Sequence, residues 1–202
     1  MTGERGEMIG GIPVSLHWRG QPAAARIADD VLAVGAGPGT DWFADPATSS
    51  LNVSAPALLG SASGDFLLAA RVEVAFAATY DAGALVLWRD DRTWAKLCFE
   101  YSPQAEPMVV SVVTRGESDD CNSAVVAGDA VWLRLARMGD AHAFHMSADG
   151  QRWLFVRHFR LGGPGPVSFG FEAQSPTGQG CEARFSGIRF DPATLGDLRD
   201  GT

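Results

Sequence analysis

The chain has 202 residues, of which 46 % are hydrophobic and 20 % are charged, and its formal net charge is −8. This length suits one all-β domain, and the apolar fraction is sufficient for a sizeable core. Because partners such as nucleic acids and anionic membrane surfaces are bound through clustered Lys and Arg, the acidic balance argues against both.

The N-terminal segment 1–11 contains no long apolar run, so it is unlike a signal peptide, and we expect it to be flexible. No stretch of the chain reaches the ~18 apolar residues of a membrane span. Residues 12–202 are expected to form a single domain. The three widely spaced cysteines lack a CxxC motif and predict neither a disulfide framework nor a zinc site. Free thiols fit a reducing compartment, so we expect a cytoplasmic protein.

The predicted elements become regular after a turn-rich joint at residues 41–46. From there on, short apolar or alternating runs are each bounded by Gly, Pro, Asp or Ser, a pattern typical of strands separated by turns. Helical periodicity is nearly absent, so the sequence predicts an all-β sandwich or barrel. In chain order the runs are SASGDFLLAARVEVAFAATY, ALVLWRD, TWAKLCFEYS, PMVVSVVTRG, AVWLRLARMG, HAFHMSADG, RWLFVRHFR, VSFGFEAQS and CEARFSGIRF.

Alternation divides the residues of these strands between two faces. In TWAKLCFEY it sends Leu97 and Phe99 towards the core. Lys96, the only lysine of the chain, and Glu100 share the opposite face, about 13 Å apart along the strand. A face with such residues is unlike a plain solvated surface and, if concave, predicts a ligand groove. The same alternation adds Trp88, Trp94, Arg134, Glu172 and Gln174 to the candidates.

Several of these runs carry a family resemblance. The pieces TYDAGALV, TWAKLCFEY, SVVTRGESDD, WLRLAR, SADGQRWLFVRHF and FGFEAQSPTGQGCEARFSGI, between residues 41 and 190, resemble the DUF1349 family. The most specific combination is W-x-K-x-x-x-E-Y followed by S-V-V-T-R and S-D. The family is similar to the concanavalin A-like lectin/glucanase superfamily, which implies a jelly-roll sandwich of two antiparallel sheets and no established reaction. The family pattern often has Gln after YD, where this chain has Ala82.

Each candidate site has a structural alternative. Lys96 and Glu100 could form a polar groove floor, or a cross-strand ion pair with Glu172 or Arg134. The indole rings of Trp88, Trp94 and Trp132 could stack on sugars, or simply cover the sheet. Residues 80–83 (YDAG) are expected to form a turn. The oxygen-rich stretch 118–122 is read as a loop whose spacing follows no known calcium site, so we assign no metal and no cofactor.

Three functions remain open. The first is a non-catalytic module that binds a carbohydrate or other small polar ligand on a concave sheet face. The second is an enzyme that acts on sugars through Glu100 with Glu172 or Asp119, although the compact acidic strand motif of retaining glucanases is missing. The third is a structural or regulatory domain that binds another protein or a second copy of itself as a homodimer. For the first, the candidate ligand-binding residues are Lys96, Glu100, Arg134, Glu172, Gln174, Trp88 and Trp94.

Overall fold

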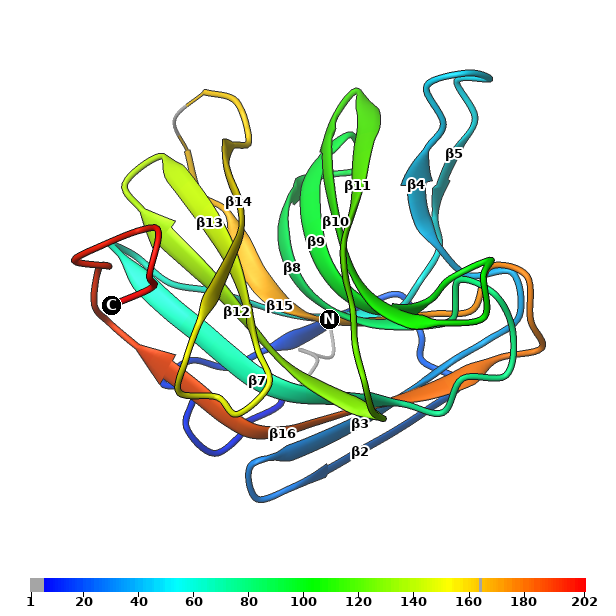
Figure 1. Ribbon diagram of the computed structural model, residues 1–202, viewed down its shortest axis with the longest axis horizontal. Helices are drawn as coiled ribbons and strands as arrows, with labels where there is room; N and C mark the ends of the chain where they lie inside the picture. Colours follow the sequence, from blue (N-terminus) through cyan, green and yellow to red (C-terminus); the bar gives the residue numbers. More distant parts are fainter. Residues whose placement is uncertain (1–5, 164) are drawn as a thin grey trace, which may run out of the picture.

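The computed structural model describes residues 6–163 and 165–202, and two antiparallel sheets make up its bulk (Figure 1). Sheet I consists, in spatial order, of β1 (His17–Arg19), β6 (Ala57–Ser61), β15 (Ser168–Gln174), β8 (Ala82–Asp90), β9 (Thr93–Tyr101), β10 (Pro107–Arg115) and β11 (Glu117–Val125). Sheet II consists of β14 (Leu154–Arg160), β13 (Ala141–Ser147), β12 (Ala130–Met138), β7 (Phe66–Val74), β16 (Cys181–Asp191), β3 (Val31–Ala36) and β2 (Ala24–Ala28).

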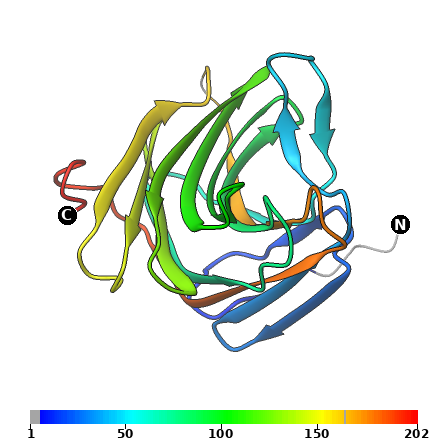
Figure 2. The same cartoon turned by 45° about the vertical axis from the view of Figure 1, so that its right-hand side comes forward.

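A small hairpin of β4 (Trp42–Ala44) and β5 (Leu51–Val53) completes the fold. Figure 2 shows it standing opposite the curved strands β8 to β11. The predicted all-β sandwich of two antiparallel sheets is confirmed. The described part of the chain contains no helix long and apolar enough to cross a membrane.

Part of the segment 1–11 packs onto the sandwich. Residues 1–5 of the expected flexible segment lie outside the described residues. The Glu7 backbone N–H donates to the Leu16 carbonyl at 2.7 Å, and Ile9 is only 2 % exposed. The packed region therefore begins before residue 12.

The main core lies between the two sheets and follows the alternation seen in the sequence. Leu97 and Phe99 of β9 point into it, and Leu133 and Leu135 of β12 meet them from sheet II. A second apolar cluster covers the outer face of sheet I, around Trp42 of the hairpin. The central strands of sheet I are therefore buried on both faces, and a polar side chain on their outer face is removed from bulk water.

The stretch 118–122, predicted to be a loop, belongs to edge strand β11, so that prediction was wrong. Asp, Asn and Ser have low strand propensity, but pairing with β10 along nearly its whole length outweighs it. Strand β11 is mostly exposed, and polar residues on such an edge discourage pairing with other chains. Cys121 is exposed on this strand, whereas Cys98 of β9 is buried.

Gly170 of β15 is a position where the sandwich tolerates no side chain. It lies opposite Leu59 of β6, and a Cβ atom there would overlap the Leu58 carbonyl oxygen. We expect Gly170→Ala to lower the free energy of unfolding by about 3 kcal/mol or more, because backbone would have to move. Urea unfolding measures this effect. Gly37→Ala, where nothing lies within 4 Å of the added Cβ, is the control; equal stability of the two variants would contradict the close pairing.

Candidate ligand-binding cleft

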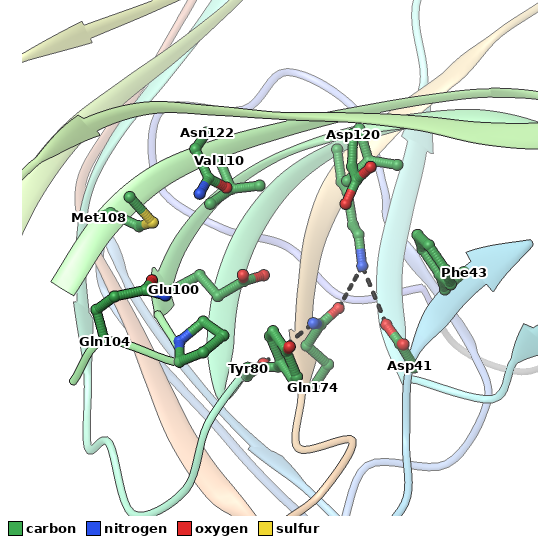
Figure 3. A pocket seen from close by; sticks show the side chains of 13 residues that line it. Asp41, Phe43, Tyr80, Glu100, Gln104, Met108, Val110, Asp120, Asn122 and Gln174 are labelled. Atoms are coloured by element: carbon green, nitrogen blue, oxygen red, sulfur yellow. Dashed lines mark hydrogen bonds and ion pairs between the residues drawn. The ribbon is translucent and has the colours of Figure 1, made fainter. Parts of the chain in front are cut away.

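A cleft of about 460 Å³ lies on the outer face of sheet I, between β9, β10, β11 and the hairpin (Figure 3). Directly paired residues of neighbouring strands point to the same face, so the register arranges its floor in rows. One row runs through Gln174, Ala82, Glu100 and Met108, and another through Val86, Lys96, Val112 and Asp120. The charged and polar side chains that line the cleft are Asp41, Lys96, Glu100, Gln104, Asp120, Asn122 and Gln174.

Lys96 lies at the centre of the floor and is 2 % exposed. Its Nζ donates to Gln174 Oε1 at 2.5 Å and to Asp41 Oδ1 at 3.1 Å. Between Lys96 Nζ and Gln174 the intervening strand β8 presents the small side chains of Ala82 and Ala84, which lets the ammonium group reach β15. Burial lowers the pKa of Lys96, but Asp41 and the other nearby negative charges outweigh burial and hold the pKa above its ordinary value, so the group stays charged.

The hairpin forms one wall of the cleft, and its position is fixed by contacts within the hairpin segment and with sheet I. Trp42 is fully buried and its Nε1 donates to the Ala55 carbonyl at 2.9 Å. Its ring lies 5.8 Å from that of Trp94 and 4.9 Å from that of Trp88. The Ala44 backbone N–H donates to Ser118 Oγ of β11 at 2.9 Å. The Trp42–Ala55 hydrogen bond lies within the hairpin segment, whereas the contacts with Trp88, Trp94 and Ser118 and the Lys96–Asp41 ion pair fasten the wall to sheet I.

Glu100 faces the cleft with its carboxyl group (Figure 3). It is 9 % exposed, and no residue in the described ranges donates a hydrogen bond to it. Burial raises its pKa to about 7; the positive charge of Lys96 opposes this, while Asp41 and Asp120 add to it. The group is therefore divided between its acid and its carboxylate form near neutral pH.

Glu172 lies on the same sheet face but is closed off from the cleft. It is fully buried, and neither carboxyl oxygen has a hydrogen-bond partner among residues 6–163 and 165–202. Burial raises its pKa to about 8, against the attraction of Lys96. Glu172 is therefore largely a neutral acid at pH 7.

Tyr80 stands at the rim of the cleft in an unusual backbone conformation. Its φ is 69°, a left-handed value that costs a bulky residue about 1–2 kcal/mol, and its side chain is 40 % exposed. Its N–H donates to the Tyr101 carbonyl at 2.7 Å, and its carbonyl accepts from Gln174 Nε2 at 3.1 Å. The turn lies at residues 78–81 rather than at the expected 80–83, because Ala82 and Gly83 already belong to β8; Asp81 accepts hydrogen bonds from the Ala77 and Ala78 amides, and its own N–H donates to the Ala78 carbonyl at 3.2 Å. The strained geometry directs an exposed aromatic ring to a polar cleft.

The structure brings together some of the candidate residues. Lys96, Glu100 and Gln174 line the cleft, and Glu172 lies on the same face. The ion pair considered for Lys96 forms with Asp41, not with Glu172 or Arg134.

Arg134 was misplaced, because alternation gives the face of a strand but not the sheet to which it belongs. It lies on β12 of sheet II and points away from sheet I, since its neighbours Leu133 and Leu135 point into the core. Its Nη2 donates to the Gly201 carbonyl at 2.7 Å, and its guanidinium stacks on Trp153. Burial lowers its pKa to about 10.

Trp88 and Trp94 do lie on the outer face of sheet I, but they do not line the cleft. Trp94 is fully buried under Trp42, and Arg19 covers Trp88 with its guanidinium 4.1 Å from the ring. The hairpin that covers them could not be foreseen from their own strands. The alternative interpretation, that these indole rings cover the sheet and do not stack on a sugar, is therefore the correct one.

The stretch 118–122 splits between two faces. Asp120 and Asn122 point into the cleft, whereas Asp119 pairs with Arg157 at 2.9 Å on the other side. Within the described ranges, no three His, Cys, Asp or Glu side chains converge on a metal-sized site. Of the carboxylates considered as partners of Glu100 for hydrolysis, Asp119 points away and Glu172 is sealed. Period-two alternation along 117–125 would have identified Asp120 and Asn122 as residues of the same face. No pattern in the sequence around Asp41 indicates that it lines the cleft.

Comparison with known families agrees with the resemblance carried by the sequence motifs between residues 41 and 190. The family model described as a protein of unknown function, DUF1349, matches residues 18–193. The chain belongs to the DUF1349 family. No curated protein matches the chain.

Solved structures share the fold of this DUF1349 protein. A functionally unknown protein from Saccharomyces cerevisiae superposes with a TM-score of 0.82 at 24 % identity, covering 90 % of this chain and 97 % of that one. The GH43 protein BlXynB from Bacillus licheniformis gives 0.65 at 13 %, covering 82 % of this chain and 34 % of that one. The exoplasmic/lumenal domain of VIP36, in a form bound to Ca²⁺ and Man3GlcNAc, gives 0.51 at 8 %, covering 92 % and 90 %. These similarities establish a concanavalin A-like fold.

The buried acid Glu172 predicts a distinctive pH dependence of stability. Its pKa is about 8 in the folded protein and near the ordinary 4.5 when unfolded, so the folded state holds more protons between these values. Its contribution to stability is therefore complete below pH 4.5 and is lost as the pH rises to 8. Glu172→Gln removes this loss. Relative to wild type, we expect the variant to gain about 3 kcal/mol between pH 5 and pH 8, at 1.36 kcal/mol per pKa unit.

Urea unfolding at several pH values measures the two stability curves. Glu182→Gln, on an exposed side chain of β16, is the matched control and should run parallel to wild type. Parallel curves for Glu172→Gln as well would show that Glu172 titrates normally in the folded protein.

Proposed function

We propose that this DUF1349 protein is a non-catalytic binding module that holds a carbohydrate, or a similar small polar ligand, in the cleft on sheet I. The observation that carries the proposal is the combination of an exposed aromatic ring at the rim, Tyr80, with inward-facing polar groups on the floor. Sugars present both apolar ring faces and hydroxyl groups, and a site of this composition matches both.

The size and chemistry of the cleft support this proposal. A volume of about 460 Å³ lies in the range of small-molecule sites. Phe43, Met108, Val110 and Val112 supply apolar lining beside the polar groups. Lectin-type and GH43 structures with the same fold provide support by analogy only, because a fold does not fix a function.

The edge strand beside the cleft, β11, gives no support to a protein-interaction domain. A long apolar edge would favour pairing with another chain. Strand β11 is long but carries Glu117, Asp119, Asp120 and Asn122, so it lacks that character.

Tyr80 provides the sharpest test of the binding role. Tyr80→Gly removes the aromatic ring and also relieves the left-handed strain, so we expect the free energy of unfolding to change by less than about 1 kcal/mol. Affinity for any saccharide that binds should fall about tenfold, the size of a lost stacking contact. Tyr80→Phe should retain affinity. Calorimetry on mono- to trisaccharides of glucose, mannose and xylose measures the affinities.

Two further variants locate the ligand on the face of the sheet. Asn122→Ala removes a cleft side chain of β11 and should weaken binding, whereas Cys121→Ser, the adjacent residue on the opposite face, should not. If Tyr80→Gly and Asn122→Ala both bind as wild type does, the ligand binds elsewhere. If no saccharide of the panel binds at millimolar concentration, the carbohydrate proposal fails.

A further inference from the structure

We propose that the cleft selects sugars that carry a free amino group, and that Glu100 and Asp120 receive the ammonium group of such an amino sugar. This inference rests on the proposed function and names its ligand class. It follows from the charged side chains of the cleft that have no oppositely charged partner within the protein.

Lys96 is the only cationic side chain that lines the cleft within the described ranges, and its charge is already matched. It pairs with Asp41 at 3.1 Å and also donates to Gln174 at 2.5 Å. The two charged groups left over are Glu100 and Asp120. No Lys, Arg or His of the described chain forms an ion pair with either of them. The open part of the cleft therefore presents uncompensated negative charge to a ligand.

The second, independent observation is the side chain of Glu100, which is nine-tenths buried, faces the cleft and has no hydrogen-bond partner among the described residues. A carboxylate that is 9 % exposed, faces the cleft and accepts no hydrogen bond from the described residues is free to accept donors from a ligand. An ammonium group supplies three donors and the opposite charge. A metal ion matches less well, because no three suitable ligands converge in the described ranges. The net charge of −8 also favours the approach of a cation over that of an acidic sugar.

The surroundings of Glu100 predict how binding depends on pH. Strands β8 and β10 pack beside it with the uncharged Ala82 and Met108. Burial holds the pKa of Glu100 near 7, so an incoming ammonium displaces a proton from part of the molecules, and affinity rises from pH 5.5 to pH 7. The titratable groups around Glu100 are Lys96 and Cys98 on its own strand, Asp41 before β4, Tyr80 at the rim, Asp120 on β11 and Glu172 on β15.

Three β-1,4-linked trisaccharides that differ only at the second carbon provide the test: the glucosamine trimer, its fully N-acetylated form and cellotriose. Calorimetry at pH 7 should show the glucosamine trimer binding at least tenfold more tightly than the other two, as expected for a charge-assisted hydrogen bond. Lowering the pH to 5.5 should weaken the glucosamine trimer several-fold and leave cellotriose unchanged. Glu100→Gln should abolish the preference. Asp120→Asn, on the exposed strand β11, should reduce it several-fold even if Glu100→Gln folds poorly.

Other outcomes overturn the inference in distinguishable ways. Cellotriose binding as tightly as the glucosamine trimer would overturn the amine preference and leave the proposed function standing. If none of the three binds at millimolar concentration, both fail. Spermidine binding as tightly as the glucosamine trimer would show that the cleft recognises amines without a sugar, and would overturn the assignment to amino sugars.

Discussion

The buried ammonium group of Lys96 is the interaction on which the candidate site depends. Removing a charge from water is costly unless charge and hydrogen-bonding capacity are matched nearby. Asp41 and Gln174 provide that match from two segments distant in sequence, one before the hairpin and one at the end of β15. The requirement to satisfy Lys96 therefore joins the floor of sheet I to the wall formed by β4 and β5.

This arrangement also decides the electrostatics of the cleft. Since Asp41 compensates Lys96, the charge of Lys96 is not available to neutralise Glu100 and Asp120 fully. Glu172, packed under the same face, avoids the cost of an isolated buried charge by remaining largely protonated. One lysine thus accompanies four carboxyl groups, each in a different state of pairing or exposure. The contacts of Lys96 therefore have two consequences. They hold the hairpin wall that shapes the cleft, and they leave the cleft with unpaired carboxyl groups that can accept hydrogen bonds.

The sequence was a good guide to the fold, because alternation is a direct consequence of strand geometry. Alternation also correctly identified Lys96, Glu100 and Gln174 as residues of the candidate site, because the face on which each lies follows from its own strand. Alternation failed for Arg134, since the period of a strand does not identify its sheet, and for Trp88 and Trp94, since the hairpin that covers them comes from elsewhere. Asp41 was missed as a partner of Lys96 because the two are 55 positions apart. The low strand propensity of residues 118–122 led to the wrong prediction of a loop. Asp120 and Asn122 were therefore not placed on the face of sheet I that forms the cleft.

The most direct test of the central claim is amide hydrogen exchange in Lys96→Met, compared with wild type. Methionine preserves the length of the side chain but cannot donate to Asp41 or Gln174. If Lys96 fastens the wall to the floor, amides of residues 41–44 should exchange at least tenfold faster in the variant, while those of β9 and β10 keep their protection. Unchanged protection of residues 41–44 would contradict the account, because the hairpin would then be held without the buried ion pair.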